Sequence, residues 1–350
     1  MAKRLPFMKT QEMDPMMMSC ANCGEEEKIG VHSKKERRYK CHSCQKTFSE
    51  TKGTVFYGLE YPIWLIMVIL KLLAYGCPVV AIVQSFSIDE RTVRAWLAKA
   101  GQHAKLVQDE LVCNGHLELG QIQADEICVK VQGGKKVWMA TAMDVFSRLF
   151  IWGEVSYSRN SQLITRLMFK VRQAASSVKA TILFSVDGFS AYRKSILKVF
   201  HTKLYTGLPG RPRHIPWPNI HIVQMVKTRH GYKLVNMTRR VLHGSWGLVC
   251  QIISMSQCGL GVINTASVER LNATFRARMP SLVRRTRSLA RTLPRLEHEL
   301  FWSGVVYNFC TVHTSLAATP AQAAGLTDHL WSIEELLRFR VSQKALHDVV

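Results

Sequence analysis

The sequence is short of acidic residues, above all in its second half. Its 350 residues include 25 aspartate and glutamate residues against 47 lysine and arginine residues, a formal net charge of +22. Between Gly188 and Leu296 there are 19 basic residues and a single acid, Glu269. This scarcity of acid favours a large polyanionic partner, and nucleic acid is the commonest one. The alternative is a basic surface that is only solvated.

A signal sequence and a disulfide framework are also missing. The first residues, MAKRLPFMKTQEMDP, contain no apolar signal core. Six of the ten cysteines are scattered singly, which is typical of a reducing compartment. We therefore expect a cytoplasmic, nucleoid-associated protein. The apolar run Pro62–Val83 is long enough to span a bilayer, but Lys71 lies inside it and Gly76-Cys77-Pro78 interrupts it. Two short buried helices are expected there, with no membrane partner.

The other four cysteines form two CxxC pairs, Cys20 with Cys23 and Cys41 with Cys44, separated by 17 residues. Two such turns can close a tetrahedron of thiolates around structural Zn²⁺. The spacing predicts a zinc ribbon over residues 20–58, with a β-hairpin at Lys28–Lys40, after a flexible tail at 1–19. Four unligated cysteines are the alternative.

Residues 59–115 are predicted to form three helices and a linker. The helices are expected at Trp64–Tyr75, Pro78–Phe86 and Glu90–Ala100. Asp89 would cap the third helix and Gly101 would end it. The tight turn before the last helix favours a helix-turn-helix, in which that helix enters the major groove of DNA. Arg91 and Arg94 would then face DNA, unless the three helices are only a linker.

Residues 116–311 have the pattern of an α/β domain with a mixed sheet flanked by helices. Strands are expected at Leu117–Val131, Lys135–Met143, Ser147–Val155, Thr181–Asp187 and Ile220–Val226, and helices at Asn160–Ser177, Phe189–Phe200, Ser267–Met279 and Leu289–Thr311. The first three strands would form an antiparallel meander. Residues 201–262 are interpreted as an insertion that starts with a loop at Thr202–Pro218. A C-terminal tail at 312–350 carries one helix, Trp331–Phe339.

Three acids lie in surroundings that disfavour a free charge. Asp125 is in the middle of a strand, Asp187 ends an apolar strand, and Glu269 is the lone acid of the basic region. Phosphodiester chemistry can use two Mg²⁺ ions about 4 Å apart, and a few carboxylates are enough to hold them. Glu126 is assigned to the opposite face, because neighbouring strand residues alternate. In the plainer interpretation, Asp187 forms a turn and Glu269 forms an internal salt bridge.

The chain resembles the DDE transposases of bacterial insertion sequences over nearly its whole length. The similarity lies in ADEI, WMATAMDVFSR, SVDGFSAY, NTASVERLNATFRAR, and VYNFCTVHTSL with TPAQAAGL. It implies an RNase H-like, retroviral-integrase-like core in which Asp125, Asp187 and Glu269 hold two Mg²⁺ or Mn²⁺ ions. A zinc ribbon with a helix-turn-helix is similar to the front end of one subgroup. One departure is the 81 residues between Asp187 and Glu269, more than compact cores of the family use.

Basic and amide side chains after Glu269 are interpreted as contacts to phosphates of element ends or target DNA. They are Asn272, Arg276, Arg278, Arg284, Arg285 and Arg287. Phosphate contacts give affinity and salt dependence more than sequence choice. A solvated helix face is the alternative.

The sequence thus predicts a multidomain DNA transposase that cleaves element ends and transfers the 3′-OH into target DNA. Its partners would be double-stranded DNA, as terminal inverted repeats and as target. A second copy of the chain is also expected, since two ends must be held together. Two other classes stay open: a catalytically inactive DNA-binding protein derived from a transposase, and a structure-selective nuclease of the same fold.

Overall fold

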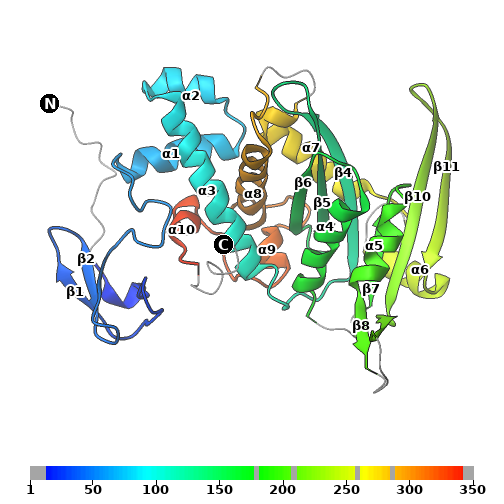
Figure 1. Ribbon diagram of the computed structural model, residues 1–350, viewed down its shortest axis with the longest axis horizontal. Coiled ribbons are helices and arrows are strands. Elements are labelled where there is room, and N and C mark those ends of the chain that lie inside the picture. Colours follow the sequence, from blue (N-terminus) through cyan, green and yellow to red (C-terminus); the bar gives the residue numbers. More distant parts are fainter. Residues whose placement is uncertain (1–12, 177–180, 206–210, 257–260, 284–287, 342–350) are drawn as a thin grey trace. The chain divides into compact units, whose positions relative to one another are not determined.

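The computed structural model describes residues 13–176, 181–205, 211–256, 261–283 and 288–341. The chain divides into two compact units (Figure 1). One comprises Met1–Tyr61 together with Leu337–Val350, and the other comprises Pro62–Leu336.

The smaller unit is built on a three-stranded antiparallel sheet. Its strands are β1 (Ile29–Ser33), β2 (Arg38–Cys41) and β3 (Thr47–Ser49), and a 3₁₀ turn, η1 (Pro15–Met17), precedes them. The hairpin predicted between the two cysteine pairs is therefore confirmed. Tyr39 and Phe48 stack across the sheet with ring centroids 5.9 Å apart and form its buried core with Cys41. From the C-terminal segment, Arg340 donates a hydrogen bond to the backbone oxygen of Glu50 at 2.9 Å.

The larger unit begins with three helices, α1 (Ile63–Ala74), α2 (Val79–Phe86) and α3 (Glu90–Leu111). Asp89 caps α3 as predicted, since its carboxylate accepts a hydrogen bond from the backbone N–H of Arg91 at 2.7 Å. The prediction that Gly101 ends this helix is wrong. A Cβ on Gly101 would lie 2.4 Å from the backbone oxygen of His298 in α8 (Leu293–Cys310), so the glycine allows two helices to cross closely.

A six-stranded mixed sheet forms the centre of this unit, in the order β11-β10-β7-β4-β5-β6 (Figure 1). Its strands are β4 (Gln121–Lys130), β5 (Lys136–Asp144), β6 (Phe150–Ser156), β7 (Ile182–Val186), β10 (Ile220–His230) and β11 (Lys233–His243). β4, β5 and β6 are the predicted antiparallel meander, whereas β7 runs parallel to both β4 and β10. The predicted α/β class with a mixed sheet is confirmed.

Residues 201–262 extend the sheet and add a small hairpin. β10 and β11 form a long antiparallel hairpin at one edge of the sheet (Figure 1), followed by helix α6 (Trp246–Met255). The prediction of a loop over Thr202–Pro218 is wrong in part, because β8 (His201–Leu204) pairs with β9 (Arg213–Pro216). Prolines obscured this pairing, although proline is tolerated in an edge strand such as β9.

Among the described residues, four helices cover the sheet: α4 (Ser161–Ala174), α5 (Ala191–Val199), α7 (Ala266–Arg278) and α8 (Leu293–Cys310). A 3₁₀ turn, η2 (Pro280–Leu282), follows α7. Two short helices, α9 (Pro320–Ala323) and α10 (Ile333–Arg338), come after α8 in the chain. The odd-numbered residues Ile127 and Val129 of β4 pack in one core with Leu271 of α7 and Leu300 of α8. The even-numbered residues of β4 therefore face the side of α4 and α5.

Helix α8 is buried on nearly all sides. The side chain of Asn308 accepts a hydrogen bond from the backbone N–H of Phe150 and donates one to its oxygen, at 2.9 and 2.7 Å. Within the described ranges, no helix has the length and apolarity needed to cross a bilayer. The run Pro62–Val83 is instead divided between α1 and α2.

Candidate metal centre

The two CxxC pairs meet in the smaller unit. One sulfur from each of Cys20, Cys23, Cys41 and Cys44 lies within 4.8 Å of all the others. The Sγ atoms of Cys20 and Cys44 are 3.7 Å apart, as are those of Cys23 and Cys41. Backbone N–H groups of Asn22 and Cys44 donate to Cys20 and Cys41. This group of four thiols could hold a zinc ion, as the spacing predicted.

The thiols influence one another electrostatically. Burial raises the pKa of Cys20, but hydrogen bonds from the backbone of Asn22 and from neighbouring thiols bring it down to about 7. A backbone hydrogen bond lowers the pKa of Cys23, whereas its closeness to the other three thiols raises it to about 12. Adjacent thiolates thus repel one another, and a bound cation would relieve this repulsion.

Asp125 and Asp187 lie together because β4 and β7 are parallel neighbours. The register pairs Ala124 of β4 with Val186 at the end of β7, so the residue that follows each of them is an aspartate at the same sheet edge. Asp187 begins a turn, since its Oδ1 accepts a hydrogen bond from the backbone N–H of Phe189 at 2.9 Å. The side-chain Nε2 of Gln224 in β10 donates a hydrogen bond to the backbone oxygen of Asp187 at 2.9 Å.

Asp125 faces helix α7. Its Oδ2 accepts a hydrogen bond from Nδ2 of Asn272 at 2.9 Å, and Thr141 on the neighbouring strand donates to Oδ1 of Asn272 at 3.0 Å. Burial raises the pKa of Asp125 and the charge of Asp187 raises it further, whereas Asn272 acts in the opposite direction. The amide of Asn272 therefore positions the Asp125 carboxylate.

Glu126 corrects the sequence prediction. Alternation along β4 assigned it to the back face, outside the cluster, yet oxygen atoms of Asp125, Glu126 and Asp187 all lie within 4.8 Å of one another. The reason is that β7 pairs with β4 only as far as Ala124. Asp187 lies beyond the end of β7, beside the open edge of β4, where carboxylates from both faces can approach it.

Arg159 holds these acids from the side of α4 and α5. Its Nη2 lies 2.7 Å from Oε2 of Glu126 and 3.2 Å from Oδ2 of Asp187. The guanidinium group also stacks between two rings, 5.0 Å from the centroid of Trp138 and 4.3 Å from that of Phe189. Burial and Asp187 raise the pKa of Glu126, and Arg159 counteracts both.

Glu269 lies in the first turn of α7 and lines a cavity that Asp125 and Asp187 also line. Its Oε1 accepts hydrogen bonds from the hydroxyl of Thr265 at 2.7 Å and from Nζ of Lys227 in β10 at 2.6 Å. Gln123 of β4 fixes this end of α7, since its Oε1 accepts a hydrogen bond from the backbone N–H of Val268 at 3.0 Å. Glu269 is not part of the close trio of Asp125, Glu126 and Asp187.

One cavity joins the three predicted acids. It has a volume of about 510 Å³, and Asp125, Asp187 and Glu269 line it together with Arg159 and Lys227. The trio of Asp125, Glu126 and Asp187 could hold a metal ion, because crowded carboxylate oxygens suit hard cations. The sequence contained no signal for Arg159 and Lys227, which come close to the acids only through the sheet order.

The predicted DNA contacts occupy different environments. Arg91 is exposed at the start of α3, and Arg94 pairs with Glu90 on the same helix at 2.5 Å. Arg276 lines a cavity beside Ile127 of β4. Arg284, Arg285 and Arg287 lie outside the described residues. For all of these residues, DNA contact stays a prediction.

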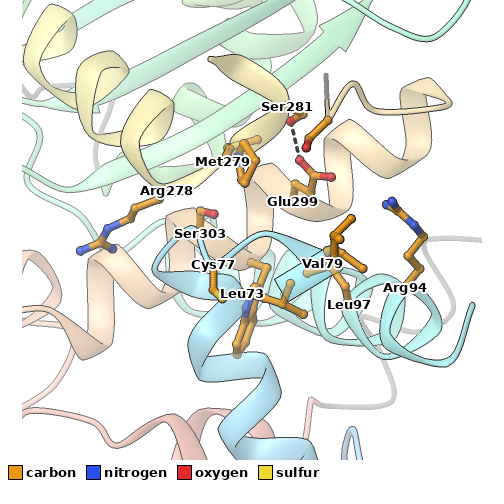
Figure 2. A pocket seen from close by; sticks show the side chains of 14 residues that line it. Leu73, Cys77, Val79, Arg94, Leu97, Arg278, Met279, Ser281, Glu299 and Ser303 are labelled. Atoms are coloured by element: carbon orange, nitrogen blue, oxygen red, sulfur yellow. Dashed lines mark hydrogen bonds between the residues drawn. The ribbon is translucent and has the colours of Figure 1, made fainter. Parts of the chain in front are cut away.

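Arg278 is held more tightly than the others. It borders a small pocket of about 50 Å³ that is also lined by residues of α1, α2, α3 and α8. Figure 2 shows its guanidinium group directed away from the other side chains of this pocket. In the same pocket, half-buried Glu299 accepts a hydrogen bond from Ser281, and desolvation raises the pKa of that carboxyl.

The chain matches no protein-family model and no curated protein.

Proposed function

We propose that this protein is a metal-dependent DNA transposase of the DDE type, whose helical segment and core form a helix-turn-helix and an RNase H-like domain. The observation that carries the proposal is the cavity in which Asp125, Asp187 and Glu269 converge from β4, the end of β7 and α7. Acids from three distant segments meet there, although the chain has a net charge of +22.

The donor set fits hard divalent cations. Asp125, Glu126 and Asp187 supply carboxylate oxygens within 4.8 Å of one another, and burial and mutual repulsion raise the pKa values of Asp125 and Glu126. Glu269 supplies a further carboxylate at the cavity wall. When bound, Mg²⁺ or Mn²⁺ ions would activate the attacking oxygen and stabilise the leaving one.

The chain's own residues would position the DNA strand and the ligands. Asn272 orients the carboxylate of Asp125, and Thr265 orients that of Glu269. Arg159 and Lys227 place positive charge at the cavity, where it would attract a phosphodiester group and stabilise negative charge that develops on it. Water would attack the phosphodiester at the element end and displace its 3′-oxygen as a 3′-OH. This 3′-OH would then attack a phosphodiester of target DNA and displace the target strand's 3′-oxygen in turn.

The smaller unit and the three helices would bind DNA outside the cavity. Structural Zn²⁺ on the four cysteines would hold the smaller unit together. Helix α3 begins after a tight turn, because Ser87 has a φ of 52° and Asp89 caps the helix. Arg91 on its exposed first turn would contact the major groove or its flanking phosphates.

One observation favours the second candidate, a DNA-binding protein without catalysis. Arg159 already pairs with Glu126 and Asp187, and Lys227 pairs with Glu269. Internal ion pairs alone would account for these acids. The two candidates differ in whether divalent cations displace the basic side chains.

A strand-transfer assay separates the candidates. The full chain is incubated with labelled duplexes that carry the DNA flanking its gene, a target plasmid, and Mg²⁺ or Mn²⁺. We expect joined product, and we expect Asp187→Asn to reduce it by roughly 10³-fold, because losing one preorganised electrostatic group has an effect of this order. The control Glu118→Gln removes an exposed carboxylate that does not line the cavity and should retain activity.

The other outcomes are equally informative. Cleavage without joining would identify a nuclease. DNA binding with neither cleavage nor joining in both metals would identify a non-catalytic binding protein and overturn the proposal.

A further inference from the structure

A separate cavity shares helix α7 with the carboxylate cavity but none of its lining residues. It has a volume of about 200 Å³, room for several water molecules at ~30 Å³ each. Four of its lining residues are basic or can become so: Arg148, Arg270, Arg278 and His313. Among the described residues that line it, none is acidic.

The protein holds two of these guanidinium groups in place. Nη1 of Arg148 donates a hydrogen bond to the hydroxyl of Ser267 at 2.8 Å, and Nη2 of Arg278 donates to the hydroxyl of Thr311 at 3.2 Å. The guanidinium of Arg278 also lies 5.0 Å from the ring centroid of Tyr75 and 5.9 Å from that of Tyr307. Arginines held in this way are preorganised to donate to a ligand.

Donor capacity remains on Arg278. Its Nη1 is buried and has no hydrogen-bond partner within the described ranges. Figure 2 shows the guanidinium directed away from the small pocket beside α1 and α3, and Arg278 also lines the basic cavity. A buried N–H without an acceptor is unfavourable, so an acceptor in this cavity would stabilise the arrangement.

The convergence of like charges also needs compensation. Burial lowers the pKa of His313, and the charges of Arg148 and Arg270 lower it further. Burial lowers the pKa of Arg278 as well. Packing against tyrosine rings stabilises one arginine but does not neutralise three. A compact oxyanion would supply oxygen atoms that accept hydrogen bonds from the arginines, and a negative charge that compensates their positive charges.

We propose that this cavity binds a phosphate group, which Arg148, Arg270 and Arg278 hold with the help of hydroxyl groups. The phosphate belongs either to a DNA backbone or to a free phosphate ion. The DNA form rests on the proposed function. Arg270 follows Glu269 directly on α7, so a backbone phosphate bound here would fix the strand relative to the carboxylate cavity.

The first experiment measures binding of inorganic phosphate to the full chain in the absence of divalent metal. Thermal unfolding is compared in about 20 mM sodium phosphate and in sodium chloride of equal ionic strength. We expect phosphate to raise the Tm of the larger unit by about 2–5 °C, because a ligand that binds only the folded state stabilises it.

Three variants test whether this shift comes from the cavity. Arg270→Gln changes an exposed side chain, so it should fold normally and lose the shift, whereas Arg270→Lys keeps the charge and should retain part of it. Lys135→Gln is the charge-matched control. It lies before the start of β5, whereas the cavity contacts Met143 at the other end of that strand.

The second experiment distinguishes the two sources of phosphate. Affinity for a duplex of arbitrary sequence is measured against salt concentration. If a backbone phosphate occupies the cavity, Arg270→Gln should reduce the slope of log K against log salt by about 0.9, and phosphate at constant ionic strength should compete with DNA for the wild type only. If the Tm shift occurs without these effects on DNA binding, the site takes free phosphate.

The proposal is overturned if phosphate gives no more stabilisation than chloride in the wild type, or if Arg270→Gln and Lys135→Gln behave alike in both experiments. Neither experiment uses cleavage or divalent metal. A failure of the phosphate proposal is therefore distinguishable from a failure of the transposase proposal, which the joining assay tests.

Discussion

The cysteine cluster and the carboxylate cluster are assembled in opposite ways. The four cysteines lie between residues 20 and 44, and a three-stranded sheet brings them together. The acids of the carboxylate cluster and its cavity lie between Asp125 and Glu269, and they meet only because β7 inserts beside β4 and α7 packs across β4 and β5. The first cluster depends on local turns, and the second depends on the topology of the whole sheet.

Their electrostatics differ as well. The thiols of the first cluster contact one another, whereas the acids of the second already pair with Arg159 and Lys227. The larger unit also has an extensive apolar core, while the buried core around the cysteines of the smaller unit is small and consists of Ile29, Tyr39 and Phe48. The smaller unit should therefore depend on its metal for folding, and the larger one only for chemistry.

The largest expected effect is the response to removal of zinc. Structural Zn²⁺ contributes ~10–16 kcal/mol in small zinc domains, so a strong chelator or Cys41→Ser should unfold the smaller unit. We expect the amide protection of residues 29–49 to be lost, while the amides of β4, β5 and β7 stay protected. Hydrogen exchange with mass spectrometry measures both regions in one sample.

Cys113→Ser is the matched control, since Cys113 is a buried cysteine of the larger unit. If chelation leaves residues 29–49 protected, the smaller unit folds without a metal and the contrast between the clusters disappears.

The second expected effect is a pH response confined to the larger unit. His103 is buried in α3, and burial lowers its pKa to about 4. Because the unfolded chain binds a proton more readily, the stability that neutral His103 contributes is present above its unfolded pKa of ~6.5 and is lost as pH falls. From pH 7 to pH 5, His103 should reduce the unfolding free energy by about 2 kcal/mol.

Denaturant titrations of the wild type and His103→Gln measure this effect. Glutamine can still donate to the backbone oxygen of Leu336, which lies 3.1 Å from Nε2 of His103. The difference between the two pH profiles isolates the histidine from the buried carboxyls, whose raised pKa values act in the opposite direction. Parallel profiles would show that His103 is solvated.

The sequence was informative where structure follows from neighbouring residues. Several features could be predicted because each depends on a local pattern. They are the cluster of four cysteines, the Asp89 cap, the meander of β4, β5 and β6, and the α/β class. Asp125, Asp187 and Glu269 line one cavity, but the close trio contains Glu126 in place of Glu269, so the metal-binding role of the three predicted acids stays a prediction. Acids in apolar or basic surroundings were the signal for these three.

The failures have a common physical cause, because each depends on a contact between distant segments. Gly101 is predicted to end a helix, but it lies inside α3 and allows α3 and α8 to cross closely. Glu126 faces the side of α4 and α5 as alternation predicts, but its exclusion from the cluster is wrong, because β7 stops opposite Ala124 and leaves Asp187 close to carboxylates of both faces. Arg159 and Lys227 had no local signal at all.

The smallest expected effect separates the clusters by sign. Asp125→Asn removes a charge whose pKa burial and Asp187 raise, and the asparagine oxygen can still accept the hydrogen bond from Asn272. The metal-free variant should therefore be more stable than the wild type at neutral pH, since a raised pKa means that the folded protein disfavours the charged carboxylate. Mg²⁺ should raise the Tm of the wild type and leave that of the variant unchanged.

Differential scanning calorimetry with and without Mg²⁺ measures both shifts, with the exposed Asp328→Asn as the control for charge. A carboxylate kept for internal ion pairing would show the reverse order, because its loss would destabilise the metal-free protein. A cysteine substitution in the smaller unit is destabilising in every condition if zinc is structural. An acid that destabilises the metal-free protein and stabilises only the metal-bound protein has metal binding as its role. The two Tm shifts decide whether Asp125 is such an acid.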